Sequence, residues 1–269
     1  MSEARRRDRV LRPLLRRVWQ DSLPEEHYSE TMWRNGFWSA ERFLERLPAP
    51  VPLEGADVLD VGCGTGNLCV LAVRRGARSA TGVDYNPLEI DLGRRMIAAE
   101  TPDAAERVEL VVGADLSPLG DRDFDVIVSK DSFEHYQQPE EMFAAMEGRL
   151  RPGGHLAIGF GPLWNAPYGP HLDTRLPWVH HLFPERLLLE EWNALRPGKH
   201  ATRLEDTGVN RMTLARFERM VEATRLTRVG YARNVSDHPA VRAMDALSRV
   251  RPLRELMVTN VYGVWRRDR

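Results

Sequence analysis

The chain has 269 residues, two cysteines and a formal net charge of −1, and 42% of its residues are hydrophobic and 29% charged. At about 150 residues per domain, this length predicts one or two domains with a core large enough to need no disulfide bonds. The composition is typical of a soluble globular protein and argues against global disorder. The near-zero charge excludes a wholly basic nucleic-acid binder, although not a local basic patch.

Neither a membrane span nor a targeting segment is expected. No apolar run approaches the roughly 18 residues that a membrane span needs, and the start lacks the apolar core of a signal peptide. Seven arginines crowd the first 17 residues, but Glu3 and Asp8 argue against a transit peptide, and a solvated helix face is favoured over an anion-binding arm. Cys63 and Cys69 are too few for a disulfide framework, so we expect a cytoplasmic protein.

Residues 1–47 are expected to be helical, because apolar and aromatic side chains recur there at approximate helical spacing. These positions are Tyr28, Trp33, Phe37, Trp38, Phe43 and Leu44. A proline-rich run at 48–52 breaks the helix and forms a short linker. Residues 1–52 are therefore predicted to form an N-terminal helical lid.

From residue 57 to residue 160, short apolar runs alternate with helical patterns. The predicted strands are Asp57–Val61, Ser79–Asp84, 108–115, 124–129 and 155–160. The predicted helices are 67–75, 87–100 and 139–150. Because strands alternate with helices at short spacing and several strands are almost continuously apolar, we expect an α/β fold whose parallel sheet is covered on both faces.

Residues 161–212 interrupt this alternation. The segment is rich in proline, tryptophan and histidine and is predicted to be an insertion. A helix is expected at 213–226, and two last strands at 227–235 and 258–265 are separated by a helical stretch around 241–256. The final pair of strands is expected to be antiparallel.

The most informative segment is the turn after the first strand, where Gly62, Gly64 and Gly66 follow Asp60 in the pattern G-x-G-x-G. A glycine turn lets a ligand approach the backbone closely, and open α/β sheets bind ligands at the carboxyl ends of their strands. Asp84 ends the second strand eighteen residues past Gly66 and can accept hydrogen bonds from both hydroxyls of a ribose. Dinucleotide sites read G-x-G-x-x-G, so the spacing disfavours a hydride-transferring enzyme. A carboxylate beside the turn suits an ammonium and a sulfonium group better than a pyrophosphate.

Five segments in this order resemble the class I S-adenosylmethionine-dependent methyltransferases of the small-molecule type. They are LDVGCGTG at 59–66, GVDYNP at 82–87, GADL at 113–116, FDVIVSKDSFEHY at 124–136 and LRPGGHLAIGF at 150–160. The resemblance implies a Rossmann-like fold with a seven-stranded mostly parallel sheet, helices on both faces and an antiparallel last strand. It also implies a methyltransferase core at 53–160 and 213–269, and an insertion after strand five, at 161–212, that caps the substrate side.

The resemblance also implies S-adenosyl-L-methionine as the cofactor and names the residues that bind it. Its methionine end would be held by Asp60, Gly62, Gly64, Gly66 and the backbone around Lys130. Asp84 would bind the ribose, with Tyr85 packed beside the adenine. Asp115 would accept a hydrogen bond from the adenine amine, and Leu116 would contribute its backbone N–H. From the residues alone, Asp115 could instead cap a helix, and Lys130 could be a surface charge.

Methyl transfer is an in-line displacement at a carbon that the sulfonium already activates, so the protein must mainly align donor and acceptor and exclude water. A hydroxyl acceptor also benefits from a base that takes its proton. His135, directly after the fourth strand, is the first candidate base; alternatively, it packs against or caps the next helix. His171 and Asp173 in the insertion are the second candidates, since histidine titrates near neutral pH.

The insertion offers two further interpretations. With His180 or His181, His171 and Asp173 could form a metal site, but no dense zinc-ligand motif is present and no metal is predicted. The aromatic residues could form a roof over a partly apolar acceptor or simply a core; they are Trp164, Tyr168, Trp178, Phe183 and Trp192.

The sequence therefore predicts an enzyme that transfers a methyl group from S-adenosylmethionine to a small-molecule acceptor. O-methylation in secondary metabolism is the first hypothesis, with carbon or nitrogen as other acceptor atoms. RNA or protein methylation is one alternative, but nucleic acid is not the favoured partner, because no Asn/Asp-Pro-Pro-Tyr/Phe motif follows the fourth strand. A second alternative is a module that binds the cofactor without transferring its methyl group.

Overall fold

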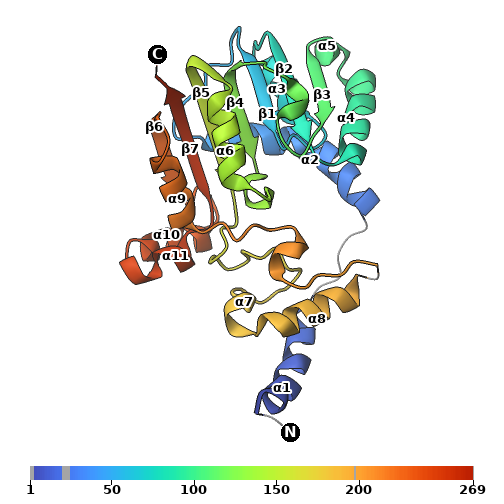
Figure 1. Ribbon diagram of the computed structural model, residues 1–269, viewed down its shortest axis with the longest axis vertical. Helices are drawn as coiled ribbons and strands as arrows, with labels where there is room; N and C mark the ends of the chain where they lie inside the picture. The colour runs from blue at the N-terminus through green and yellow to red at the C-terminus, as the bar shows by residue number, and fades with distance from the viewer. Residues whose placement is uncertain (1–2, 20–24, 197, 269) are drawn as a thin grey trace.

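The computed structural model describes residues 3–19, 25–196 and 198–268. The side chains of six residues named or counted above lie outside this description: Glu3, Arg5, Arg6, Arg7, Arg9 and Tyr28. In Figure 1 the sheet and its flanking helices form the upper part of the molecule, and the first helix and the insertion lie below them. Within the described residues, the helices are too short or too polar to cross a membrane.

A seven-stranded sheet forms the centre of the fold, in the order β3-β2-β1-β4-β5-β7-β6. Its strands are β1 (Asp57–Val61), β2 (Ser79–Asp84), β3 (Val108–Val112), β4 (Phe124–Lys130), β5 (Leu150–Phe160), β6 (Leu226–Arg233) and β7 (Val261–Arg267). β1 pairs in parallel with β2 and β4, whereas β7 pairs antiparallel with both β5 and β6. The predicted Rossmann-like, mostly parallel sheet is therefore confirmed. The carboxyl ends of its parallel strands meet at the edge that faces the insertion (Figure 1).

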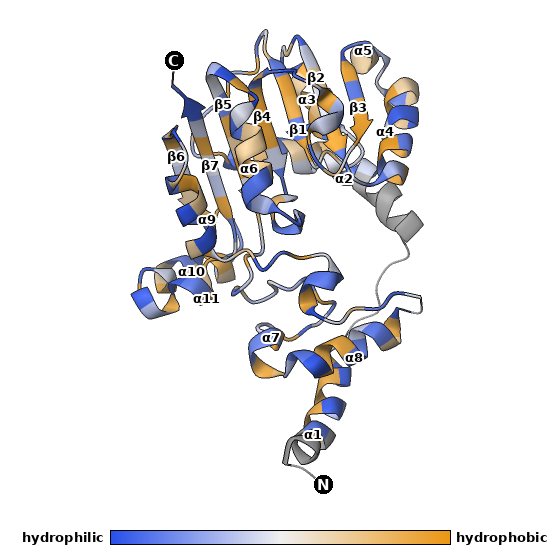
Figure 2. Ribbon diagram, viewed as in Figure 1, coloured by the Kyte–Doolittle hydropathy of each residue, from blue (hydrophilic) through white to orange (hydrophobic). Residues whose placement is uncertain are grey.

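Helices cover both faces of the sheet, as predicted. They are α2 (Glu25–Arg46), α3 (Asn67–Arg74), α4 (Pro87–Glu100), α5 (Pro102–Ala105), α6 (Pro139–Gly148), α9 (Leu214–Glu222), α10 (Pro239–Ser248) and α11 (Arg254–Met257), with short 3₁₀ turns η1 (Ser117–Leu119), η2 (Phe133–His135) and η4 (Arg251–Leu253). One apolar cluster joins Trp33 of α2 and Ile90 of α4 to the sheet. On the other face, Phe143 and Phe217 stack edge-on against Trp265. The central strands are correspondingly the most apolar part of the molecule (Figure 2).

The last two strands lie slightly away from their predicted positions. They were expected at 227–235 and 258–265 and are found at Leu226–Arg233 and Val261–Arg267. The reason lies in Asn234, whose side chain accepts a hydrogen bond from Thr259 N at 2.7 Å and donates one to Met257 O at 2.9 Å. These side-chain bonds satisfy the backbone between the strands, so the ladder does not extend there.

The first helix packs against the insertion, while the second packs against the sheet. The insertion contains α7 (Val179–Leu182), α8 (Glu185–Leu195) and η3 (Leu204–Thr207). In α1 (Glu3–Val18), Leu15 is fully buried in a cluster with Leu187 of the insertion. Arg16 Nε donates to both carboxylate oxygens of Glu191, at 3.1 and 2.9 Å. The division into 1–52, 53–160 with 213–269, and 161–212 stays a prediction.

Leu15 provides a test of this packing. We expect Leu15→Ala to lower the free energy of unfolding by about 2–5 kcal/mol, because it leaves a cavity in the cluster that joins α1 to α8. Hydrogen exchange should become faster in α1 and α8 and stay unchanged in α3. Leu14→Ala is the matched control, since Leu14 is 47% exposed. Equal effects of the two variants would contradict the packing of α1 on the insertion.

Candidate functional site

The glycine turn after β1 is held from two sides. Gly62, Gly64 and Gly66 have φ angles of 77°, 52° and 83°, in the left-handed region that glycine adopts without strain. Gly62 N donates to Val83 O at 2.8 Å, and Ser132 Oγ donates to Gly62 O at 3.0 Å. A Cβ atom on Gly62 would lie 2.3 Å from Ser132 Oγ, so the close approach of these loops requires glycine.

Asp60 is a buried carboxylate at the entrance to this turn. It is 2% exposed, and its Oδ1 atom has no hydrogen-bond partner among the described residues. Its Oδ2 atom lies 3.9 Å from Cys69 Sγ, which is a weak donor. Burial raises the pKa of Asp60 to about 7, while the charge of Lys130 acts in the opposite direction. A buried carboxylate oxygen without a donor is costly and favours a ligand that brings N–H donors or positive charge.

Asp84 ties the end of β2 to the glycine turn. Its Oδ2 atom accepts a hydrogen bond from Gly64 N, and its Oδ1 atom accepts one from Asn86 N, both at 2.9 Å. Burial nevertheless raises the pKa of Asp84 above its ordinary value. Each carboxylate oxygen can accept a further bond. Tyr85 follows with 73% of its surface exposed.

The remaining residues expected at the cofactor site differ in their surroundings. Asp115 is exposed, and its Oδ1 atom accepts hydrogen bonds from Ser117 N at 2.9 Å and Ser117 Oγ at 2.6 Å, which closes the turn before η1. These bonds lower the pKa of Asp115. Leu116 is 2% exposed. Lys130 lies beside the glycine turn at the end of β4, where its Nζ atom donates to Asp131 Oδ2 at 2.9 Å.

Two histidines that are far apart in the sequence meet at this edge of the sheet. The rings of His135 and His171 lie with their centroids 5.0 Å apart and their planes at 75°. His135 Nδ1 lies 2.6 Å from Gly208 O. Burial, together with the neighbouring His135, lowers the pKa of His171 to about 4. His171 also has a φ angle of 51°, which is strained for a residue with a Cβ atom.

Glu134 joins these histidines and was not among the residues expected to carry chemistry. One ligand atom from each of Glu134, His135 and His171 lies within 4.8 Å of the others. Gly161 N donates to Glu134 Oε1 at 3.2 Å, whereas Oε2 is buried without a partner among the described residues. Burial raises the pKa of Glu134 to about 8. The only sequence signal was its position next to His135.

The structure does not bring Asp173 into this cluster. Its carboxylate forms an ion pair with Arg196 of the loop after α8. His180 instead packs against Trp164 and His181, with ring centroids 5.2 and 4.0 Å away. Across the described part of the chain, the groups that could hold a metal include neither Asp173 nor His180.

The aromatic residues of the insertion mostly form its interior. Phe183 and Trp192 are buried in the cluster that also contains Leu15. Trp164 packs at the edge of this cluster, with the Arg211 guanidinium 4.9 Å from the centre of its ring. Trp178 Nε1 donates to Leu256 O at 3.3 Å and links the insertion to α11.

The comparisons with known proteins agree with this geometry. The chain belongs to the family described as methyltransferase domain, whose model matches residues 32–229. The predicted resemblance to the class I S-adenosylmethionine-dependent methyltransferases is therefore confirmed.

The curated relatives and solved structures that are similar to the chain include the following two proteins and one structure. A tRNA U34 carboxymethyltransferase of Methylococcus capsulatus is 30% identical over 178 residues, which are 63% of this chain and 52% of that protein. A ubiquinone biosynthesis O-methyltransferase of Cereibacter sphaeroides is 34% identical over 115 residues, 43% of this chain and 45% of that protein. The chain thus spans about half the length of these relatives.

The solved structure is that of geranyl diphosphate C-methyltransferase from Streptomyces coelicolor in complex with Mg²⁺, geranyl diphosphate and S-adenosyl-L-homocysteine. The TM-score is 0.55 at 19% identity, covering 87% of this chain and 80% of that chain. The two proteins share the fold.

Glu134 predicts how stability depends on pH. Its pKa is about 8 in the folded protein and ordinarily 4.5, so the folded state binds more protons between these values. Stability from this group is present below pH 4.5 and is lost as the pH rises toward 8, with a slope of up to about 1.4 kcal/mol per pH unit. Glu134→Gln should remove this slope, which urea unfolding at pH 5, 6, 7 and 8 measures.

The control for this experiment is Glu140→Gln. The Glu140 carboxylate forms an ion pair with Arg216 at 2.7 Å, which lowers the pKa of Glu140. Glu140→Gln should therefore leave the loss of stability between pH 5 and pH 8 unchanged. Parallel stability curves for the wild type and Glu134→Gln would show that Glu134 is ionised in the folded protein.

Proposed function

We propose that this protein transfers the methyl group of S-adenosylmethionine to a small molecule, with a hydroxyl oxygen as the acceptor atom. The observation that carries the proposal is the unpartnered Oδ1 atom of buried Asp60 beside the glycine turn. An ammonium group supplies both the N–H donors and the positive charge that this oxygen lacks. The positive φ angles of the turn leave the backbone open to close approach by a ligand.

The assignment of the cofactor residues follows from their positions. The methionine end is assigned to Asp60, Gly62, Gly64, Gly66 and the backbone at Lys130. Asp84 lies at the end of the neighbouring strand, where its remaining acceptor sites suit the two ribose hydroxyls. The exposed ring of Tyr85 offers a surface for the adenine, while Asp115 and Leu116 are assigned to the adenine edge. When bound, the cofactor supplies a methyl group already activated by a sulfonium.

His135 is the residue that we assign as the general base. A carbonyl oxygen can only accept a hydrogen bond, so the contact with Gly208 O places a proton on Nδ1 of His135. The lone pair of the neutral ring then lies on Nε2, which can take the proton from an acceptor hydroxyl. The contact also fixes the ring plane, as a base within an enzyme requires.

His171 and Asp173 have supporting roles in this proposal. The low pKa of His171 keeps its ring neutral at pH 7, so it adds no positive charge beside His135 and leaves that ring free to accept a proton. Asp173 is engaged by Arg196 and is assigned a structural role in the insertion. His135 and His171 together thus form the proton-handling part of the site.

The small-molecule acceptor is supported by the ubiquinone O-methyltransferase relative, and the same proposal places the activity in the cytoplasm and in secondary metabolism. Both cysteines are free, which is consistent with a reducing compartment. The second candidate acceptor is tRNA, because another relative is a tRNA U34 carboxymethyltransferase. Incubation with S-adenosylmethionine and either a panel of phenols or total tRNA, followed by quantification of S-adenosylhomocysteine, separates the two. Binding of the cofactor without product from any acceptor would favour the non-catalytic module.

Asp60 tests the cofactor site directly. Asp60→Asn should weaken the binding of S-adenosylmethionine at least tenfold, measured by isothermal titration calorimetry, because it removes the negative charge from the methionine end. Its free energy of unfolding should stay equal or rise, since a buried carboxylate without a partner is costly.

Asp57→Asn is the contrasting control for Asp60→Asn. The Asp57 carboxylate forms ion pairs with Arg78 at 2.5 Å and with Arg151 at 2.9 Å. Asp57→Asn should therefore lower the free energy of unfolding without weakening the binding of S-adenosylmethionine. If Asp60→Asn binds the cofactor as tightly as the wild type, the assignment of the methionine end fails.

His135 tests the proposed chemistry once an acceptor is identified. His135→Gln should lower kcat by about 10²- to 10⁴-fold, because the acceptor loses its general base. The dissociation constant of S-adenosylhomocysteine should not change. His155→Gln, in the middle of β5 and opposite Val126 of β4, is the control and should keep full activity. An unchanged kcat in His135→Gln would exclude His135 as the base.

A further inference from the structure

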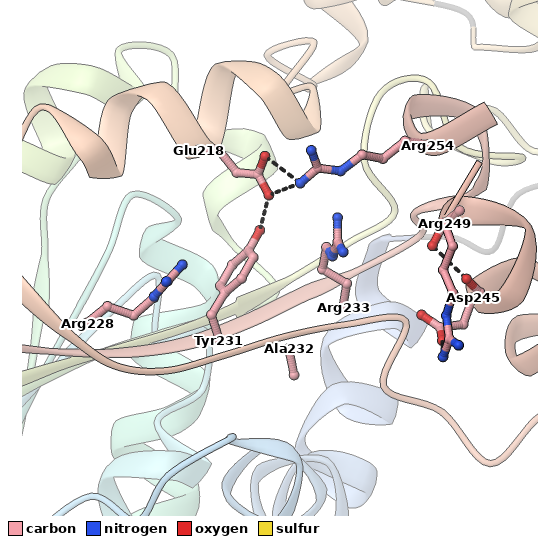
Figure 3. Close-up of a pocket in the computed structure, with 9 residues that line it drawn as sticks. Glu218, Arg228, Tyr231, Ala232, Arg233, Asp245, Arg249 and Arg254 are labelled. Carbon is pink, nitrogen blue, oxygen red and sulfur yellow. Dashed lines mark hydrogen bonds and ion pairs between the residues drawn. The ribbon is translucent and has the colours of Figure 1, made fainter. Parts of the chain in front are cut away.

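A cavity lies at the outer edge of the sheet, between β6, α9, α10 and α11. Its volume is about 480 Å³, within the range of pockets that hold small molecules. The charged side chains around it are Arg228, Arg233, Arg249, Arg254, Glu218 and Asp245 (Figure 3). None of these residues belongs to the glycine turn or to the histidine pair.

The positive charges in this cavity outnumber the negative ones. Arg254 Nη2 donates to both carboxylate oxygens of Glu218, at 2.7 and 2.8 Å. Arg249 Nη2 donates to Asp245 at 3.3 Å. Arg228 and Arg233 have no ion pair or hydrogen bond of their side chains within the described residues, so the lining carries a net charge of four minus two, or +2.

Two of the guanidinium groups also have buried donors without acceptors. These are Nη1 of Arg233 and Nε of Arg254, each shielded from solvent and unpartnered among the described residues. In Figure 3 the head of Arg233 points into the space beside Arg254 and Tyr231. An anion with several oxygen atoms would stabilise these two guanidinium groups, because it offsets their positive charges and accepts hydrogen bonds from their unpartnered N–H groups.

We propose that this cavity binds a small molecule with at least two negative charges, carried by phosphate or carboxylate groups. Arginine forks match both groups in bidentate geometry. The arginines converge on a concave cavity rather than forming a long stripe, and the net charge of the chain is −1, which favours a small anion over the backbone of a nucleic acid.

The experiment titrates the full-length protein with pyrophosphate and, separately, with citrate, by isothermal titration calorimetry. We expect one of the two to bind with a millimolar or lower dissociation constant, and the tighter one identifies the anionic group. Arg233→Gln should weaken that binding at least tenfold. Arg225→Gln, which removes the same charge from an exposed position outside the cavity, should bind as the wild type does.

Glu218→Gln provides the opposite variant. It keeps a hydrogen-bond acceptor for Arg254 but raises the charge of the lining by one, so binding should become several-fold tighter. The dissociation constant of S-adenosylhomocysteine should be unchanged in every variant, which separates this site from the proposed methyltransferase function. The absence of binding at 10 mM, or equal binding by Arg233→Gln and Arg225→Gln, would overturn the proposal. So would an RNA that binds at Arg233 and that neither anion displaces.

Discussion

The structure depends on the hydrogen bonds that hold the chain where it leaves β1. The loop is fixed from the β2 side by the Val83 carbonyl, which binds Gly62 N, and by the Asp84 carboxylate, which binds Gly64 N. From the β4 side, Ser132 reaches the carbonyl of Gly62. The ends of three strands, β1, β2 and β4, thus meet at this loop. The hydrogen bonds fix the positions of the side chains at this edge of the sheet relative to the loop. Because the loops approach so closely, the sequence must be glycine there.

Much of the structure at this edge of the sheet could be predicted, because the sequence patterns that indicate its strands and turns are local. The first two strands lie at Asp57–Val61 and Ser79–Asp84, as their apolar runs and bounding glycines indicated. The third strand ends at Val112, earlier than predicted: Gly113 N still donates to Asp84 O at 2.8 Å, but the chain then turns at Asp115, whose carboxylate accepts a hydrogen bond from Ser117 N. The fifth strand begins at Leu150 rather than at residue 155, since residues 150–154 also form strand, with a shift in register against β4.

The unpredictable part depends on contacts between distant segments. His171 reaches His135 only because the insertion folds back over the sheet edge, and neither residue carries a periodic signal for that contact. Asp173 lies two residues further on, yet it pairs with Arg196 instead. The sequence pattern therefore predicted which types of residue carry chemistry, but not which of these side chains lie together at the edge of the sheet. Leu15 is a similar case, because its apolar character did not reveal that it packs on the insertion.

Two buried carboxyl groups at this edge of the sheet, Asp60 and Glu134, relate ligand binding to the protonation state of the site. Asp60 and Glu134 both have raised pKa values, of about 7 and about 8, because burial disfavours their charged forms. On the assignment proposed above, the ammonium group of the cofactor would stabilise the ionised form of Asp60, so that binding near neutral pH would release a proton. The raised pKa of Glu134 favours its protonated form at neutral pH, in which the carboxyl group can donate a hydrogen bond. Burial thus acts on both carboxyl groups in the same direction, and the proposed cation at Asp60 is what would make their states differ, while Glu134 lies beside the histidines.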